Sequence, residues 1–346
     1  MARPLTTSDV LADFTTFHVG GRAARLIVAL DEAELIDVLR QIGPGRDDLL
    51  VVSGGSNMLV SDDGFPGTAV VIATTGITAE ADGDRVRLTV AAGETWDDLV
   101  AHTLDRGWSG LEMLSGIPGL AGAAPIQNIG AYGAEAASVI TEVRAFDRDT
   151  DRIVVIPAQQ CGFGYRNSMF KQAAGRYVVL GIGLALRVSG LSGPIEYKEL
   201  ATSLGLGLGD RAPLADVRQA VLALRRGKGM VLDETDHDTW SAGSFFTNPL
   251  LSPGTAAGLP TAAPRFPQPD GSVKTSAAWL IEQTGFHKGY GLGPARLSGK
   301  HVLALTNQGG ATARDILHLA HQIRDRVRTV YGVTLTPEPQ LVGLNW

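Results

Sequence analysis

The chain has 346 residues, a length that predicts two or three domains of about 150 residues each. Hydrophobic residues make up 44% and charged residues 19%, which is ordinary for a folded protein and argues against disorder. The formal net charge of −6 argues against binding to nucleic acid, because that binding depends on clustered lysine and arginine. Any anionic ligand must therefore be held by local features of the chain.

Cysteine usage and the N-terminal sequence indicate where the protein works. Cys161 is the only cysteine, so no intrachain disulfide can form, which suits a reducing compartment. The opening MARPLTTSDVLADF lacks the apolar core of a secretory signal, and no run reaches the roughly 18 apolar residues of a membrane span. We therefore expect a cytoplasmic protein without membrane insertion.

The predicted elements mix helices and strands. A helix is expected over residues 31–42, where apolar residues recur at helical spacing between Asp31 and Gly43. A second helix should begin at Thr95. Short apolar runs predict strands at Leu49–Val52, Ala69–Ile72, Val86–Val90, Val143–Phe146, Ile153–Ile156 and Tyr177–Val188. Residues 203–213 and 253–271 have the composition of surface connections.

A late helix shows the clearest amphipathic pattern. One apolar stripe is formed by Ile316, Leu319, Ile323, Val327 and Val330. Gly332 should end this helix, and a short strand and Pro337-Glu338-Pro339 follow. His318 and His321 lie three residues apart on it, but no third ligand is evident in the sequence. We predict no metal site there.

Two glycine-rich loops are candidates for phosphate binding. Residues 51–60, VVSGGSNMLV, place Gly-Gly-Ser-Asn after a strand, where successive backbone N–H groups can converge on a phosphate; a surface turn explains this loop equally well. Residues 114–133, LSGIPGLAGAAPIQNIGAYG, carry no charge and contain five glycines. An uncharged loop of this length is uncommon unless it is functional, and its small side chains let backbone amides approach a pyrophosphate.

Two other nucleotide motifs are incomplete. Gly181-Ile182-Gly183 lies within an apolar run with no third glycine, and we interpret it as strand. Residues 293–301, GPARLSGKH, imitate a P-loop but have one residue too many between the glycines, and His301 stands where Ser or Thr should follow Lys300. A kinase or NTPase is therefore a poor interpretation.

Taken together, the two glycine loops, CGFGYRNSMFK, SAGSFFTNP and GVTLTPEPQLVG resemble the UDP-N-acetylenolpyruvoylglucosamine reductase (MurB) family, in that order and over nearly the whole chain. The resemblance implies an α+β fold of the vanillyl-alcohol-oxidase (PCMH) type. It would comprise a first FAD-binding subdomain (residues 1–75, joined by 336–346), a second (76–227) and a substrate-binding domain (228–335). Ala123-Ala124, Thr15 and the segment Lys228–Val231 depart from the family pattern.

The resemblance also implies the cofactors and the reaction. FAD would be the cofactor and NADPH the hydride donor, and UDP-N-acetylglucosamine enolpyruvate would be reduced to UDP-N-acetylmuramate in peptidoglycan precursor synthesis. The partner is then a small nucleotide sugar rather than nucleic acid, and a monomer is expected. The residues implied for FAD binding are Gly54, Gly55, Ser56, Asn57, Met58, Ser115, Gly116, Ile117, Pro118, Gly122 and Ala123.

By the same resemblance, Arg166, Ser244 and Glu338 form the catalytic set. A planar guanidinium suits charge that spreads into the substrate carboxylate, and a fixed serine hydroxyl can give its proton to a strongly basic enolate-like intermediate. Glu338 would assist either as a protonated acid or by ordering a water. Phe245 and Phe246 are interpreted as core residues.

Substrate contacts are implied for Tyr165, Tyr197, Lys228, Asn248 and Lys288, and Tyr197 suggests the branch whose tyrosine loop closes over the nucleotide sugar. Two alternatives remain open. One is an FAD-dependent oxidase of the same fold acting on an alcohol or lactone, and the other is a nucleotide-sugar sensor that binds without turnover.

Overall fold

The computed structural model describes residues 8–45, 48–291 and 293–346. The first seven residues, half of the stretch that we interpreted as lacking a secretory signal, lie outside these ranges. The chain divides into two compact units. The first contains residues 1–9, 23–54 and 66–227, and the second contains residues 10–22, 55–65 and 228–346.

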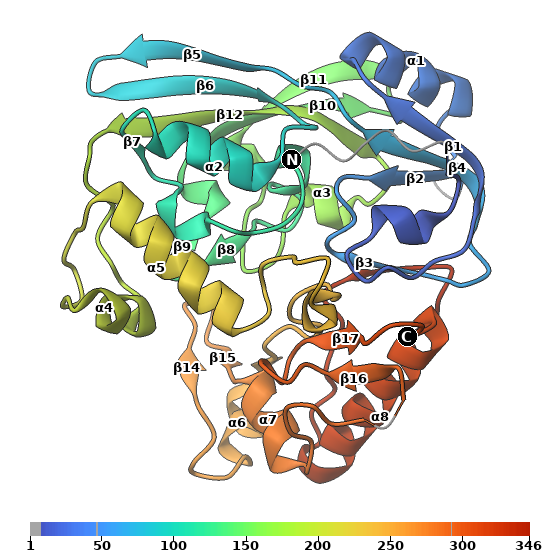
Figure 1. Ribbon diagram of the computed structural model, residues 1–346, viewed down its shortest axis with the longest axis vertical. Coiled ribbons are helices and arrows are strands. Elements are labelled where there is room, and N and C mark those ends of the chain that lie inside the picture. The colour runs from blue at the N-terminus through green and yellow to red at the C-terminus, as the bar shows by residue number, and fades with distance from the viewer. Residues whose placement is uncertain (1–7, 46–47, 292) are drawn as a thin grey trace. The chain divides into compact units, whose positions relative to one another are not determined.

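The first unit contains two sheets. A three-stranded sheet has the order β1 (Ala23–Ala29), β4 (Phe65–Ile72), β2 (Leu49–Val52). The larger sheet has the order β11 (Arg152–Pro157), β10 (Ile140–Asp147), β12 (Tyr177–Val188), β6 (Arg85–Ala91), β5 (Ile77–Asp82), and these strands can be followed side by side in Figure 1. The short strand β7 (Trp108–Ser109) also pairs with β12, and β8 (Gly130–Ala131) pairs with β9 (Ala134–Glu135). Gly181 and Gly183 lie inside β12, as predicted.

The two helices predicted for the first unit begin where the sequence indicates, and three further helices were not predicted. In α1 (Glu32–Ile42), the Asp31 side chain accepts the Glu34 N–H at 2.8 Å, and Gly43 ends the helix at φ +76°. Thr95 precedes α2 (Trp96–Leu104), although its side chain makes no cap hydrogen bond. The other helices of this unit are α3 (Met169–Gln172), α4 (Lys198–Leu204) and α5 (Leu214–Gly227).

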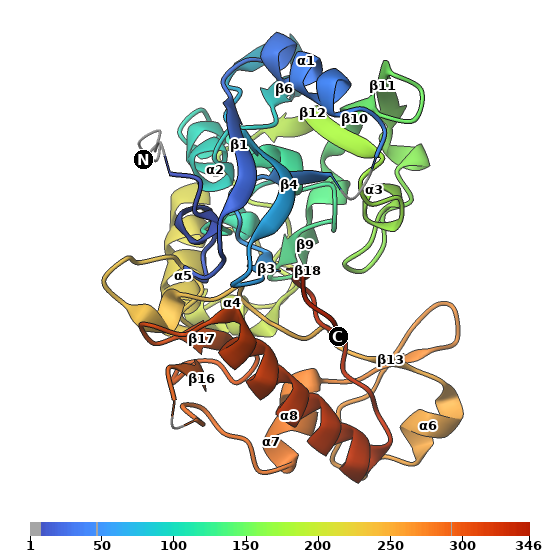
Figure 2. The ribbon, with the colours of Figure 1, turned by 90° about the vertical axis from the view of Figure 1, so that its right-hand side faces the viewer.

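The second unit is built around α8 (Ala313–Tyr331), which packs on α7 (Ala277–Gln283) and on the hairpin of β16 (Ala295–Leu297) and β17 (Leu305–Asn307), as Figure 2 shows. Gly332 ends α8 in the left-handed conformation, as predicted. Val330 is 44% exposed, so its place in the predicted stripe is wrong and the buried face stops at Val327. Phe245 and Phe246 are fully buried in this core, also as predicted.

Residues 253–271 are more ordered than their composition indicates. They contain α6 (Pro253–Ala257) and β14 (Phe266–Pro267), which pairs with β15 (Val273–Lys274) beside β13 (Leu250–Leu251). Ser252 caps α6, and Arg265 donates hydrogen bonds to carbonyl groups such as that of Leu259. Side-chain bonds to the backbone therefore replace the missing apolar pattern.

The C-terminal segment returns to the early part of the chain within the second unit. Strand β18 (Gln340–Val342) pairs in parallel with β3 (Met58–Val60), and the Gln340 N–H donates to the Asn57 carbonyl at 2.9 Å. The end of the first glycine loop, residues 57–60, is thus fixed by residues near the end of the chain.

Candidate functional site

The two glycine loops meet through backbone atoms. Gly54 and Gly119 have φ values of +78° and +107°, and a Cβ on Gly54 would lie 2.7 Å from the Gly119 Cα. Only glycine satisfies both conditions, because a side chain at Gly54 would overlap the other loop. The first unit therefore joins two segments that lie 65 residues apart and that the sequence analysis identified independently (119 − 54 = 65).

The first unit provides groups suited to an anionic cofactor. The Ser53 Oγ is buried and has no hydrogen-bond partner among the described residues, so an unused donor lies next to the Gly-Gly turn. Gly54 has a positive φ of +78°, a turn geometry in which a backbone N–H can face a phosphate. These features fit the FAD pyrophosphate.

The second glycine loop is not without structure. Short 3-10 helices occur at Glu112–Leu114 and Ala121–Ala123, and the Trp96 Nε1–H donates to the Leu114 carbonyl at 3.1 Å. Seven of the residues predicted to bind FAD belong to the first unit: Gly54 in the first glycine loop, and Ser115, Gly116, Ile117, Pro118, Gly122 and Ala123 in the second. Gly55, Ser56, Asn57 and Met58 belong to the second unit.

Gly116 is held on both sides by side chains. Its N–H donates to Asp97 at 2.5 Å, and its carbonyl accepts the Arg225 Nε–H at 3.1 Å. Burial opposes the charge of Asp97, but hydrogen bonds from Arg218 and the Gly116 N–H outweigh it and lower the pKa of this carboxyl. Burial lowers the pKa of Arg225 to about 10, which leaves it charged at neutral pH. The loop is thus held by two ionised groups.

Arg166 lies in a tight turn of the first unit. Gly164 and Asn167 exchange backbone hydrogen bonds around it, and its φ of +51° is uncommon for a residue with a side chain. Its Nη2 donates to the Gly130 carbonyl at 2.8 Å and its Nη1 to the Asn128 carbonyl at 3.4 Å. The guanidinium is therefore oriented by the second glycine loop.

The surroundings of Arg166 contain residues that the sequence analysis did not select. Asn128 and Tyr132 also have positive φ values, and strain of this kind is often concentrated at functional sites. Burial raises the pKa of Tyr132 to about 12, and its ring meets that of Tyr197 edge-on at 5.5 Å. Asn128 and Tyr132 lie in the second glycine loop, which the sequence had already marked as functional, so this loop was the signal that could have identified them.

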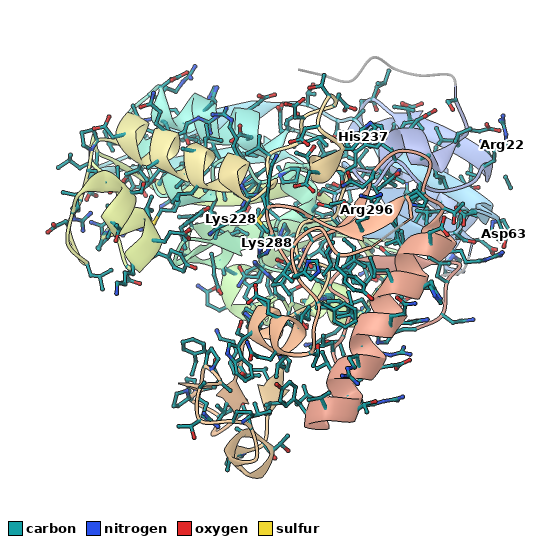
Figure 3. The ribbon with its side chains drawn as sticks, turned by 60° about the horizontal axis from the view of Figure 1, so that its bottom comes forward. Arg22, Asp63, Lys228, His237, Lys288 and Arg296 are labelled. Atoms are coloured by element: carbon teal, nitrogen blue, oxygen red, sulfur yellow. The ribbon has the colours of Figure 1, made fainter. Side chains whose placement is uncertain are left out.

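The predicted substrate residues divide between the units. Tyr165 and Tyr197 are exposed in the first unit, and an open cavity of about 680 Å³ borders Tyr197 and α4. Lys228, Asn248 and Lys288 belong to the second unit, where Figure 3 labels both lysines. Asn248 already accepts the Ala277 N–H at the start of α7 at 3.0 Å, so its side chain is partly committed to holding that helix.

The second unit brings Ser244 and Glu338 together. The Glu338 N–H donates to the Phe245 carbonyl at 2.8 Å, and Pro337 forms a bridge with Phe246. The Glu338 carbonyl accepts the Asn57 side chain at 3.4 Å. Two of the three predicted catalytic residues are thus neighbours along one backbone ladder, although 94 residues separate them in sequence (338 − 244 = 94).

Two negative findings concern the described residues only. Within them, no group of three or more His, Cys, Asp or Glu side chains is arranged to hold a metal ion. None of the described helices is long and apolar enough to cross a membrane. His321 packs on the Trp346 ring at 5.0 Å, and His318 lies 2.9 Å from the Gln322 amide.

Comparison with known proteins identifies the class and the family. Residues 23–156 match the FAD binding domain family, and residues 234–342 match the family described as UDP-N-acetylenolpyruvoylglucosamine reductase, C-terminal domain. The chain is therefore an FAD-binding oxidoreductase with a PCMH-type cofactor domain, as the sequence predicted.

It belongs to the UDP-N-acetylenolpyruvoylglucosamine reductase (MurB) family. The reductase of Streptomyces avermitilis is 52% identical, covering 97% of this chain and 94% of its own, and that of Thermobifida fusca is 51% identical, covering 97% of both. The crystal structure of the Thermus caldophilus enzyme matches with a TM-score of 0.63 at 26% identity, covering 96% of this chain and 97% of that one.

A substitution tests the first glycine loop. A Cβ on Gly55 would lie 1.8 Å from the Phe14 carbonyl oxygen, and φ there is +57°. We expect Gly55→Ala to lower the free energy of unfolding by at least about 1–3 kcal/mol and to release FAD. The measurements are thermal unfolding and the flavin absorbance that remains after gel filtration.

Gly190→Ala is the matched control, because a Cβ there meets nothing within 4 Å and its φ is not positive. Should Gly55→Ala retain FAD and stability as well as Gly190→Ala does, the loop does not need glycine at this position.

Proposed function

We propose that the chain reduces UDP-N-acetylglucosamine enolpyruvate to UDP-N-acetylmuramate with NADPH as the hydride donor, in peptidoglycan precursor synthesis. The observation that carries this proposal is the identity of about half the residues with reductases of this name over nearly the full length. A three-part organisation remains the proposed domain scheme, with FAD-binding parts at residues 1–75 plus 336–346 and at 76–227, and a substrate-binding part at 228–335.

The glycine loops would hold the cofactor. Ser53 and Gly54 are the groups of the first unit suited to its pyrophosphate, and Asp97 and Arg225 would hold the second loop in place through Gly116. When bound, FAD would supply the hydride to the substrate from its N5 atom after receiving it from NADPH. Backbone N–H groups in a turn suit this role, because they form a concave binding site for an anion without a lysine.

Arg166 is proposed to stabilise the negative charge that develops on the substrate. Hydride addition to the enol ether leaves carbanion character next to the carboxylate, and charge spreads into the carboxylate oxygens. The carbonyls of Asn128 and Gly130 orient the guanidinium before substrate arrives, so little reorganisation is needed in the transition state. This preorganisation supports the assignment.

Ser244 is proposed to give its hydroxyl proton to the neighbouring carbon, and Glu338 to assist it. The hydrogen bond from the Glu338 N–H to the Phe245 carbonyl holds these two residues near each other. Phe245 and Phe246, which follow Ser244 in the chain, are fully buried, and this limits the motion of the Ser244 backbone. Either a protonated Glu338 or a water bound to it would serve.

Substrate binding is proposed for Tyr165 and Tyr197 and for Lys228, Asn248 and Lys288. Tyr197 is 44% exposed at the start of α4 and borders the open cavity, a position from which a loop could close over the nucleotide sugar. This supports membership of the branch with a tyrosine loop. We further propose that the enzyme acts in the cytoplasm as a monomer, where its single cysteine stays reduced.

An anaerobic visible spectrum tests the function directly. We expect the purified protein to show a flavin band that bleaches with NADPH and returns when UDP-N-acetylglucosamine enolpyruvate is added. A band that only oxygen restores would favour an oxidase, and a protein that cannot be loaded with flavin would refute the proposal.

A further inference from the structure

We propose that His301 is a positioning residue for Ser244, holding the hydroxyl whose proton the reaction uses. The inference rests on the proposed function and adds a residue to it. In the sequence, His301 counts against a P-loop because Ser or Thr should stand there, and no role was predicted for it. In the structure, His301 lies next to Ser244. The Ser244 Oγ lies 3.4 Å from the His301 Nε2.

The contact is supported by the backbone on both sides. The Phe245 N–H, directly after Ser244, donates to the Leu303 carbonyl at 2.7 Å. The segments around Ser244 and His301 are therefore held together by more than the side-chain contact. A distance of 3.4 Å is long for a hydrogen bond, but such bonds commonly tighten when substrate binds.

The turn that carries His301 is itself fixed. The Ser298 Oγ accepts the N–H groups of Lys300 at 2.9 Å and of His301 at 3.1 Å, and it donates to the Asp238 Oδ2 at 2.8 Å. The other oxygen of Asp238 accepts the Gly299 N–H at 2.9 Å. One carboxylate thus organises the whole turn from residue 298 to residue 301.

A second carboxylate strengthens this arrangement. Asp236 forms an ion pair with Lys300, which raises the pKa of that lysine, and its Oδ1 accepts the Asp238 N–H at 3.0 Å. Both acids lie within residues 234–342, the part of the chain that matches the C-terminal domain family. They supply the carboxylates that position the His301 turn.

The test compares the two half-reactions by rapid mixing. We expect His301→Ala to keep its FAD and its rate of reduction by NADPH, and to slow reoxidation by the enolpyruvyl sugar at saturation by about 10- to 100-fold. His301→Gln should restore most of the rate, because its amide reaches a similar position. An unchanged rate in His301→Ala, or a change only in the sugar concentration for half-saturation, would overturn the proposal.

A double-mutant cycle separates positioning from general damage. If His301 acts through Ser244, His301→Ala should cost little more in a protein that already carries Ser244→Ala, because groups that act as a unit are not additive. Full additivity would contradict the inference. His318→Ala is the matched control, since His318 is exposed on α8, where it lies 2.9 Å from the Gln322 amide, and its loss should leave both half-reactions unchanged.

A measurement without turnover distinguishes this inference from the proposed function. In nitrogen-labelled protein, the ring resonances of His301 should shift in Ser244→Ala, whereas those of His318 should not. If the wild-type flavin is not reoxidised by the sugar, the proposed function fails and the resonances still test the contact. If the sugar reoxidises the flavin and the resonances do not move, only the inference fails.

Discussion

Ser244→Ala should leave the reduction of flavin by NADPH intact and slow its reoxidation by the enolpyruvyl sugar by two to three decades. This corresponds to roughly 3 kcal/mol, the usual cost of losing one preorganised group at a reacting centre. The effect falls on one half-reaction because only the second requires a proton at carbon. Stopped-flow spectra of each half-reaction measure the two rates separately.

Ser189→Ala provides the comparison, because the half-buried Ser189 hydroxyl bonds within its own turn, donating to the Leu191 carbonyl at 2.9 Å and accepting the Leu191 N–H at 3.0 Å. We expect both rates to be normal in that variant. Equal slowing of the two half-reactions in Ser244→Ala would rule out the proton-donor role, since it would indicate a change in flavin binding instead.

Arg166→Lys should reduce reoxidation at least about 100-fold although the positive charge is retained. The guanidinium uses two nitrogens, one toward Gly130 and one toward Asn128, and a lysine has one nitrogen to replace both. The fixed orientation toward a substrate carboxylate would therefore be lost. The check is the rate of reoxidation at saturating sugar, with flavin content measured in the same sample.

Arg87→Lys is the control substitution. Arg87 forms an exposed ion pair with Asp82, with 3.0 Å between Nε and Oδ2, and such pairs contribute little. Its kinetics should be those of the wild type. Near-normal turnover in Arg166→Lys would contradict carboxylate stabilisation by a guanidinium.

The local patterns determined much of the secondary structure. Asp31 and Gly43 marked the ends of α1, and the apolar run Tyr177–Val188 marked the longest strand without error. These predictions succeeded because caps, glycine stops and apolar spacing act between residues a few positions apart. The prediction for Val330 failed because the spacing of apolar residues does not show where the packed part of a helix ends.

The family motifs determined the class of the enzyme, and the comparisons confirm it. The glycine loops, CGFGYRN and GSFF were sufficient to name the family and FAD as its cofactor. They could do so because the chemistry constrains the residue types at each position. The roles of Arg166, Ser244 and Glu338 stay predictions until the variants are measured.

Only the tertiary structure decided which distant residues act together. The approach of Gly54 to Gly119, the two ionised side chains around Gly116 and the contact of Ser244 with His301 join segments between 19 and 109 residues apart. Their residue types are ordinary in isolation: Asp238 lies in a short 3-10 helix (His237–Thr239) and His301 in a loop, and no motif in the sequence links the two. Hydrogen bonds of this kind depend on distance and direction in space, and neither is encoded in the spacing of residues along the chain.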